Sequence, residues 1–274
     1  GAANNTFKVV WGSNSYVLRF YTRDKSLAKV EEHLYKRFQD QLPMPKMLWS
    51  SSYQSHPLAL FEFCYKPSLY DVKKEEAAFC SYDLGKALAA IHSITFEEGG
   101  LFDADLSITP IFEEGSSPYL EYCLDHLTAD HSIWDVLGND TSLRLLEFIK
   151  EYQELFPLIE KKGQLVHSDF KPVNLLWDRE EGLTVLDWEF AHSGHPLIDF
   201  GILLRHEKEF SLDKESLQKG YLENGALLPE DWISRAYMTD FVNLIQLLNT
   251  SPIRPKFFQQ LTERINLYLK GEIF

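Results

Sequence analysis

The sequence predicts an α+β fold in which a β-rich N-terminal part precedes a longer, mainly helical part. Short apolar or alternating runs, which are typical of strands, cluster before residue 66. Beyond residue 75, apolar residues recur at the three- and four-residue spacing of helices. The 274 residues can bury a large core, either as one large domain or as two lobes.

The expected strands of the first part span residues 7–10, 16–20, 46–50 and 58–64. The first two flank a short polar loop and should form a β-hairpin. A helix over residues 27–39 would place Leu34 and Phe38 on one face. The expected helices of the second part span residues 75–93, 118–127, 141–158, 197–205, 214–223, 229–248 and 255–269.

Two short stretches carry the residues best suited to chemistry. The stretch His167-Ser-Asp-Phe-Lys-Pro-Val-Asn174 has the spacing H-x-D-x-x-x-x-N, and Leu183-Thr-Val-Leu-Asp187 is an apolar run that ends in a carboxylate. Together Asp169, Asn174 and Asp187 supply a candidate base and two oxygen ligands for a metal. Phosphoryl transfer requires this combination.

The spacing between these stretches predicts a β-hairpin. Residues 173–177 and 183–188 have the character of strands, and the polar segment 178–182, which ends in Gly, is typical of their loop. If the hairpin turns near residue 180, the numbers of paired residues sum to about 360. Asn174 then lies beside Asp187. Because Mg²⁺ prefers one or two oxygen ligands from protein, with phosphate and water as the others, we expect Asn174 and Asp187 to hold it.

Asp169 precedes Asn174 by five residues, on the loop that leads into the hairpin. This position brings a second carboxylate near the metal without requiring it to be a ligand, so it could accept the proton of an attacking hydroxyl. A lone Asp after a strand is usually a cap or a surface group. The joint pattern of H-x-D-x-x-x-x-N, two strands and a second Asp favours a phosphoryl-transfer site over coincidence.

These motifs resemble those of the aminoglycoside phosphotransferase and choline kinase family, whose members carry H-G-D-x-x-x-x-N followed by a D-x-x metal motif. The resemblance covers essentially the whole chain. It implies a protein-kinase-like two-lobe fold with a small antiparallel β-sheet N-lobe over residues 1–66, a hinge near 61–67, and a larger, mainly helical C-lobe over residues 67–274. The catalytic loop would span residues 167–174 and the metal motif 187–189.

The resemblance also implies roles within the catalytic loop, where Asp169 accepts or orients the hydroxyl proton and His167 braces the loop. Ser168 replaces the usual Gly, and Lys171 stands where many members have His. Neither change removes the base or a metal ligand, and Lys171 is included among the catalytic candidates. Further on, Asp199 is either the family's brace for this loop or the N-cap of the helix that follows it.

For the nucleotide, the resemblance implies a phosphate clamp. Arg19 ends an apolar strand and would hold the α- and β-phosphates with a permanent charge. Glu31, or Glu32 in its place, would pair with Arg19, unless both are solvated helix residues. Asn4 and Asn5 loosely match a loop that covers the phosphates. Since the chain starts at this loop, we expect a preceding strand to be missing.

The run of residues 58–65 resembles the family's hinge between lobes. Backbone groups of Glu62, Phe63 and Cys64 would bind adenine, and apolar side chains would stack on it; a plain edge strand is the alternative. Pro67 falls near the usual hinge Gly. The cofactors implied are therefore ATP or GTP, together with Mg²⁺.

The net charge of −14 is concentrated in one segment. Residues 97–160 hold two basic and fifteen acidic residues, a net of −13. This argues against a nucleic-acid partner, because phosphate backbones need basic surfaces. The segment is either a solvated helical face or the wall of a cleft that attracts cations. We expect a small, cationic substrate, such as an aminoglycoside, an amino sugar or a choline-like molecule.

Composition also bears on location. No apolar run reaches about 18 residues, so no transmembrane helix is expected, and no secretory signal is visible. The three cysteines, Cys64, Cys80 and Cys123, are widely spaced and odd in number, which favours neither a disulfide framework nor a zinc cluster. A reducing cytoplasm and no membrane partner are therefore expected.

The resemblance implies a small-molecule kinase that moves the γ-phosphoryl group of ATP to a substrate hydroxyl. Two other classes stay open. A nucleotide-binding pseudokinase with a regulatory role is one, although Asp169, Asn174 and Asp187 are all retained. A metal-dependent hydrolase that uses the same carboxylates is the other.

Overall fold

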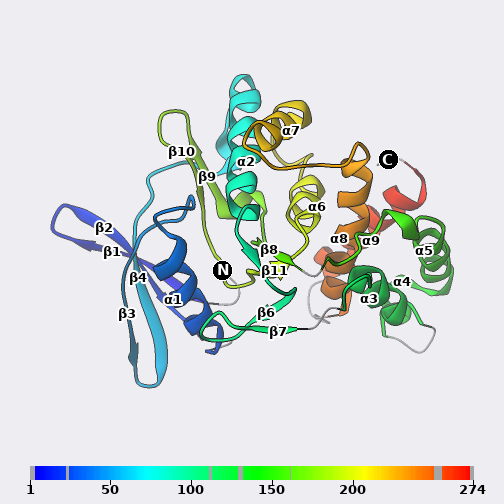
Figure 1. Cartoon of the computed structure of the whole chain (residues 1–274), viewed down its shortest axis with the longest axis horizontal. Coiled ribbons are helices and arrows are strands. Elements are labelled where there is room, and N and C mark those ends of the chain that lie inside the picture. The colour runs from blue at the N-terminus through cyan, green and yellow to red at the C-terminus, as the bar shows by residue number, and fades with distance from the viewer. Residues whose placement is uncertain are drawn as a thin grey trace.

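The structure, a computed structural model, describes residues 4–22, 25–110, 113–128, 132–160, 162–249 and 255–271. An antiparallel sheet with one helix forms the N-terminal part, and helices with two further sheets form the rest (Figure 1). This arrangement confirms the predicted α+β fold class.

The N-terminal sheet contains strands β1 (Asn5–Trp11), β2 (Asn14–Phe20), β3 (Met47–Tyr53) and β4 (His56–Glu62), in the order β1-β2-β4-β3. Helix α1 (Leu27–Phe38) buries Leu34, Tyr35 and Phe38, and the rings of Tyr35 and Phe61 on β4 lie 5.0 Å apart. These elements begin and end within three residues of the predicted positions.

The rest of the chain is mainly helical. Its helices are α2 (Ala77–His92), α3 (Pro118–His126), α4 (Ile133–Leu137), α5 (Asn139–Glu151), α6 (Leu197–Arg205), α7 (Lys214–Glu223), α8 (Trp232–Asn249) and α9 (Pro255–Leu269). Helix α4 escapes prediction because five residues are too few to show a helical period. The helix expected to reach residue 158 ends at Glu151, because a 3₁₀ turn (Gln153–Leu155) and Pro157 follow. Within the ranges described, no helix is long and apolar enough to cross a membrane.

A second sheet, which the sequence does not predict, contains β5 (Thr95–Phe96), β6 (Gly100–Phe102), β7 (Ile108–Pro110), β8 (Gly163–Val166) and β11 (His192–Gly194), in the order β5-β8-β11-β6-β7. Strands of two to four residues are too short to show alternation, so the pattern does not reveal them. Strand β8 ends directly before His167, and this sheet therefore sets the start of the predicted catalytic loop.

A two-stranded hairpin of β9 (Leu175–Asp178) and β10 (Gly182–Val185) follows that loop. Further 3₁₀ turns span Leu69–Asp71, Lys74–Glu76 and Pro172–Asn174. The hairpin is held to the segment that leaves the N-terminal sheet, because the amide of Trp177 donates to the carbonyl of Pro67 at 3.0 Å.

Two glycines set the distance between α2 and α7. A Cβ on Gly85 would lie 2.0 Å from the carbonyl oxygen of Leu217, and one on Gly220 would lie 2.1 Å from the carbonyl oxygen of Tyr82. Neither contact is possible for a larger residue, so glycine at both positions allows the close approach of the two helices. Helix α2 ends at His92, whose position therefore depends on this packing.

We expect Gly85→Ala to lower the free energy of unfolding by about 1–3 kcal/mol, because the helices must separate to admit the methyl group. The better helix propensity of Ala, about 1 kcal/mol, opposes this loss and does not remove it. Urea unfolding at equilibrium measures the change. Lys86→Ala, at the exposed next position on α2, is the control and should stay within about 0.5 kcal/mol of the parent. Equal stability of the two variants would contradict the packing argument.

Candidate active site

The predicted hairpin forms with the expected register. Strands β9 and β10 pair so that the residue numbers of each pair sum to 360. The amide of Leu186 donates to the carbonyl of Asn174 at 2.8 Å, so the pairing continues past the strands and brings Asn174 beside Asp187. The first strand begins at Leu175 rather than at residue 173, because Pro172–Asn174 forms a 3₁₀ turn.

The carboxylate of Asp169 is held by two neighbours. Asn174 Nδ2 donates to Asp169 Oδ2 at 2.8 Å and to its carbonyl oxygen at 3.0 Å, and Lys171 Nζ lies 2.8 Å from the same Oδ2. No bond from a described residue reaches Oδ1, so this oxygen is available to a substrate proton. Lys171 thus lies at the candidate base.

The loop rests on the buried carboxylate of Asp199. Its Oδ2 accepts the amide of His167 at 2.8 Å and lies 3.1 Å from His92 Nε2, while its Oδ1 accepts the amide of Ser168 at 2.7 Å. Burial alone would raise the pKa of Asp199, but these hydrogen bonds and the nearby histidines hold it below its ordinary value. His167 Nε2 in turn lies 2.9 Å from the carbonyl oxygen of Leu186, which connects the loop to the hairpin.

The position of Asp199 distinguishes its two predicted roles, as a brace for the loop or as a helix N-cap. Helix α6 begins at Leu197, which places Asp199 in its first turn rather than at its N-cap. The N-cap interpretation is therefore wrong, and the carboxylate instead faces the loop. Ser168 has φ of +60°, a left-handed conformation that suits Gly, which explains why Gly is usual there and why Ser is tolerated only under constraint.

Arg19 joins the N-terminal sheet to the hairpin. Its Nη1 donates to both carboxylate oxygens of Glu31, at 2.8 and 3.0 Å, and its Nη2 lies 2.9 Å from Asp187 Oδ1. Tyr21 also donates to Glu31, which is fully buried. Burial would lower the pKa of Arg19, but the two carboxylates raise it, so the guanidinium stays charged. Glu32 instead pairs with lysines on α1, which selects Glu31 as the partner of Arg19.

The two N-terminal asparagines differ. Asn4 is buried and its Nδ2 donates to Glu189, while its Oδ1 accepts the amide of Thr22 at 3.3 Å. Asn5 is exposed on β1, where it pairs with Phe20 and makes no described contact with the hairpin. The contact between Asn4 and Glu189 joins residues 185 positions apart, and no local sequence pattern could have revealed it.

The expected hinge begins at the end of β4, and its three residues differ in whether their backbone groups can still bind a ligand. The amide of Glu62 donates to the carbonyl of Lys46 at 3.0 Å, so it is already occupied. Phe63 lies beneath Lys8, whose Nζ is 4.1 Å from its ring centre, and Cys64 is half-buried. Of the three predicted residues, Phe63 and Cys64 therefore retain backbone groups for a ligand more readily than the amide of Glu62.

Lys66 makes contacts with the hairpin that the sequence does not predict. Its Nζ donates to the carbonyls of Glu181 and Gly182, both at 3.2 Å, and to Thr184 Oγ1 at 3.0 Å. The hinge segment is therefore fastened to the turn of the hairpin. The sequence predicts the loop of the hairpin, but it does not indicate that Lys66 donates to the carbonyl groups of this loop.

The oxygen atoms near Asp187 are suitable ligands for a divalent cation. Asp187 Oδ1 is buried and, although close to Arg19, lacks a partner in hydrogen-bond geometry. Burial and the charge of Asp187 raise the pKa of Glu189 to about 7, so this corner has an excess of negative charge. Within the described ranges no three His, Cys, Asp or Glu side chains gather as a metal site. A cation would therefore use Asn174 and Asp187 with phosphate or water, as Mg²⁺ usually does.

The acidic segment is solvated. Every acidic residue of 97–160 that the structure describes has an exposed side chain. Helices α3, α4 and α5, which carry many of these residues, lie on the side of the molecule away from β1–β4 (Figure 1). The exposed acids match the solvated-face alternative, and Glu31, Asp169 and Asp187 supply the negative charge of the site itself.

Comparison with known proteins places this geometry in context. The sequence model of the family described as "Phosphotransferase enzyme family" matches residues 1–232. No curated protein sequence matches the chain significantly.

Solved structures share the fold. A thermostable mutant of aminoglycoside phosphotransferase APH(4)-Ia, in ternary complex with ADP and hygromycin B, has a TM-score of 0.71 at 17% identity, covering 99% of this chain and 91% of the other. Spectinomycin phosphotransferase APH(9)-Ia with ADP and spectinomycin gives 0.60 at 15% identity, covering 98% and 90%. ADP-bound APH(2'')-Ib gives 0.61 at 18% identity, covering 99% and 95%. The predicted protein-kinase-like fold is confirmed.

We expect Glu189→Gln to stabilise the protein at pH 8 and to leave it nearly unchanged at pH 4. The folded-state pKa of about 7 exceeds the unfolded value, so folding favours the protonated acid, and stability falls as the pH rises from about 4.5 through 7. A neutral Gln avoids this loss, which is worth about 1–3 kcal/mol at pH 8. Unfolding in EDTA at both pH values measures it. Glu180→Gln, an exposed carboxylate in the hairpin loop, is the control, and a similar gain in that variant would contradict the assignment.

Proposed function

We propose that this chain, which belongs to the phosphotransferase enzyme family, transfers the γ-phosphoryl group of ATP to a hydroxyl group of a small, cationic molecule. The observation that carries the proposal is Arg19, which is bound to Glu31 on one side and to Asp187 on the other. It lies where a phosphate clamp must adjoin a metal ligand. GTP is the alternative donor.

The chain's own residues divide the work of positioning and charge neutralisation, which supply most of the catalysis in phosphoryl transfer. Arg19, oriented by Glu31, would hold phosphate oxygens with its remaining donors. Asn174 and Asp187 would hold Mg²⁺, which neutralises charge on the phosphates when bound.

At the acceptor, Asp169 would accept or orient the proton of the hydroxyl through its free Oδ1. Lys171 shares Oδ2 with Asn174 and would keep the carboxylate oriented. Its ammonium group is also near enough to the base to neutralise charge on the transferred group. His167 would brace the loop through Leu186.

For the nucleotide, residues 1–66 would serve as the binding lobe, with a hinge near 61–67, and residues 67–274 as the catalytic lobe. Asn4 and Asn5 would lie over the phosphates, and the backbone of Glu62, Phe63 and Cys64 would receive the base. The buried contact of Asn4 with Glu189 supports its part. Asn5 has the weaker support because its side chain is exposed.

The acceptor is proposed to be cationic for two reasons. The carboxylates of Asp169 and Asp187 bring negative charge to the candidate site, which would attract cations. Similar folds are described in complex with hygromycin B and with spectinomycin. The cytoplasm is the proposed location, because Cys64, Cys80 and Cys123 are free thiols, as a reducing compartment keeps them.

Two rival functions remain to be separated from this one. A pseudokinase would bind nucleotide without turnover, and a metal-dependent hydrolase would show no nucleotide dependence. A thermal-shift screen with an ATP analogue and Mg²⁺, against aminoglycosides, amino sugars and choline analogues, distinguishes them. The proposed kinase should show nucleotide stabilisation that requires Mg²⁺, and further stabilisation by its acceptor.

We expect Asp169→Ala to lower the phosphotransfer rate at least about 10³-fold, because the hydroxyl loses its proton acceptor and orientation. ATP affinity should change little, since Asp169 is not among the proposed nucleotide contacts. A coupled ADP-release assay with an acceptor from the screen measures the rate. Asp105→Asn, an exposed carboxylate distant in sequence from the loop, is the control. Retained turnover in Asp169→Ala would remove the base assignment.

A further inference from the structure

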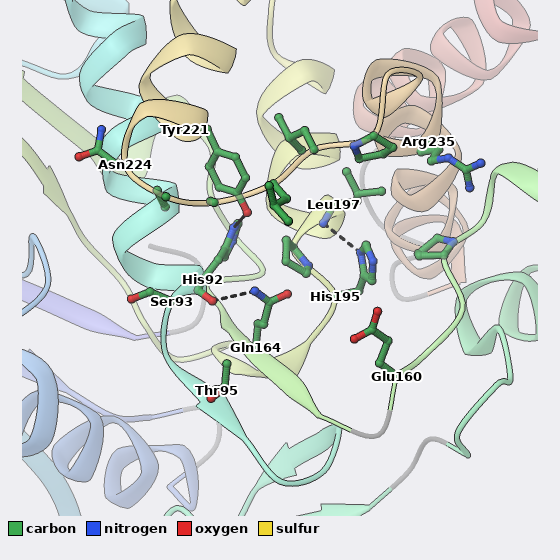
Figure 2. A pocket seen from close by; sticks show the side chains of 18 of the residues that line it. His92, Ser93, Thr95, Glu160, Gln164, His195, Leu197, Tyr221, Asn224 and Arg235 are labelled. Atoms are coloured by element: carbon green, nitrogen blue, oxygen red, sulfur yellow. Dashed lines mark hydrogen bonds between the residues drawn. The ribbon is translucent and has the colours of Figure 1, made fainter.

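A cavity of about 610 Å³ lies beside His92, Gln164 and His195 (Figure 2). It is formed by the end of α2, the start of β8, the start of α6 and the segment 224–229 between α7 and α8. No residue of the loop 167–174 or of the hairpin lines it. It is therefore separate from the candidate active site.

One wall of this cavity is apolar and exposed at its rim. Leu227 is 89% exposed and Leu158 is 62% exposed, although both are large apolar side chains at the edge of a hollow. Ala226 and Leu228, which are half-buried, and the exposed Pro229 extend this apolar surface. Solvent-exposed leucines beside a concave apolar wall favour a ligand with an apolar body.

The opposite wall offers one donor and two acceptors. His195 Nδ1 accepts the amide of Leu197 at 3.3 Å, so the proton of the neutral ring lies on Nε2. Burial, together with the charges of His92 and Arg235, lowers the pKa of His195 to about 4, so the ring stays neutral at pH 7. Gln164 uses its Nε2 for the carbonyl of His92 at 2.8 Å, which turns its Oε1 toward His195 and the side of the cavity where Glu160 lies (Figure 2).

The charge of the lining is effectively negative. Glu160 forms no bond with any residue that the structure describes, and it is the one carboxylate in the lining. Arg235, the one guanidinium, is already engaged by Asp231 Oδ1 at 2.8 Å and by the carbonyl of Glu154 at 3.0 Å. A cation therefore gains an unpaired partner here, whereas an anion is repelled by Glu160.

We propose that this cavity is a second binding site, for a small amphiphilic monocation whose ammonium group meets Glu160 and Gln164 and whose apolar body lies against Leu227. The site stands apart from the phosphotransfer proposed above, because it shares no lining residue with it. Primary alkylammonium ions are the simplest probes of this chemistry.

The test is a titration of the whole chain, without nucleotide, with butyl-, hexyl- and octylammonium, followed by amide chemical shifts in NMR. Affinity should rise about two- to fourfold for each added methylene, because each buries apolar surface against the leucine wall. Shifts should concentrate at residues 92–95 and 224–229. Heptanoate, which carries the same hexyl chain and the opposite charge, should bind at least tenfold more weakly than hexylammonium.

Two variants localise the binding. Ala226→Trp, which fills the apolar wall, should weaken hexylammonium binding at least tenfold, and Glu160→Gln should weaken it about two- to fivefold, as expected for a partly exposed ion pair. Ala78→Trp and Glu151→Gln, at exposed positions outside the cavity, are the matched controls and should bind as the parent does. Affinity that is independent of chain length, or binding that Ala226→Trp leaves intact, would overturn the site. Phosphotransfer assays on the same variants report separately on the proposed function.

Discussion

The position of the catalytic loop depends on the fully buried carboxylate of Asp199. Its two oxygens accept the consecutive amides of His167 and Ser168, and one of them also lies against His92. Buried amides left without a partner cost about 1–3 kcal/mol each, whereas a surface ion pair is worth about 0–1 kcal/mol. The hydrogen bonds to Asp199 therefore contribute more to the stability of this loop than a surface ion pair would. They also hold Ser168 in its left-handed conformation.

A second constraint joins the two parts of the molecule. Arg19 on β2 reaches Asp187 beyond the hairpin, and Asn4 reaches Glu189 two residues later. Burial and the charge of Asp187 raise the pKa of Glu189, and the positive charge of Arg19 opposes this rise only in part. In the proposed function, Arg19 already contacts the carboxylate that would hold the metal, and such preorganisation would favour electrostatic catalysis.

Local patterns predicted the parts of this architecture that depend on local interactions. The hairpin register followed from loop length alone, because pairing in a tight turn is fixed by its centre. The start of the first strand was wrong by two residues, since Pro172 favours a turn that the apolar pattern does not record. The short strands of the second sheet and the contacts of Asn4, Lys66 and His92 depend on residues distant in sequence, which no single-sequence period encodes.

His92 connects the cavity to the loop, because it lines the cavity and also contacts Asp199. Gln164, which lines the same cavity, donates to the carbonyl of His92 and is the second residue of β8, the strand that leads to His167. A ligand in the cavity can shift the loop only as far as it binds one arrangement of His92 better than another. By the same linkage, substrates that order the loop must change the affinity of the cavity by an equal factor. Asp199 is held by two backbone amides and by the side chain of His92, so a rotation of His92 would remove one of the three contacts that position this carboxylate.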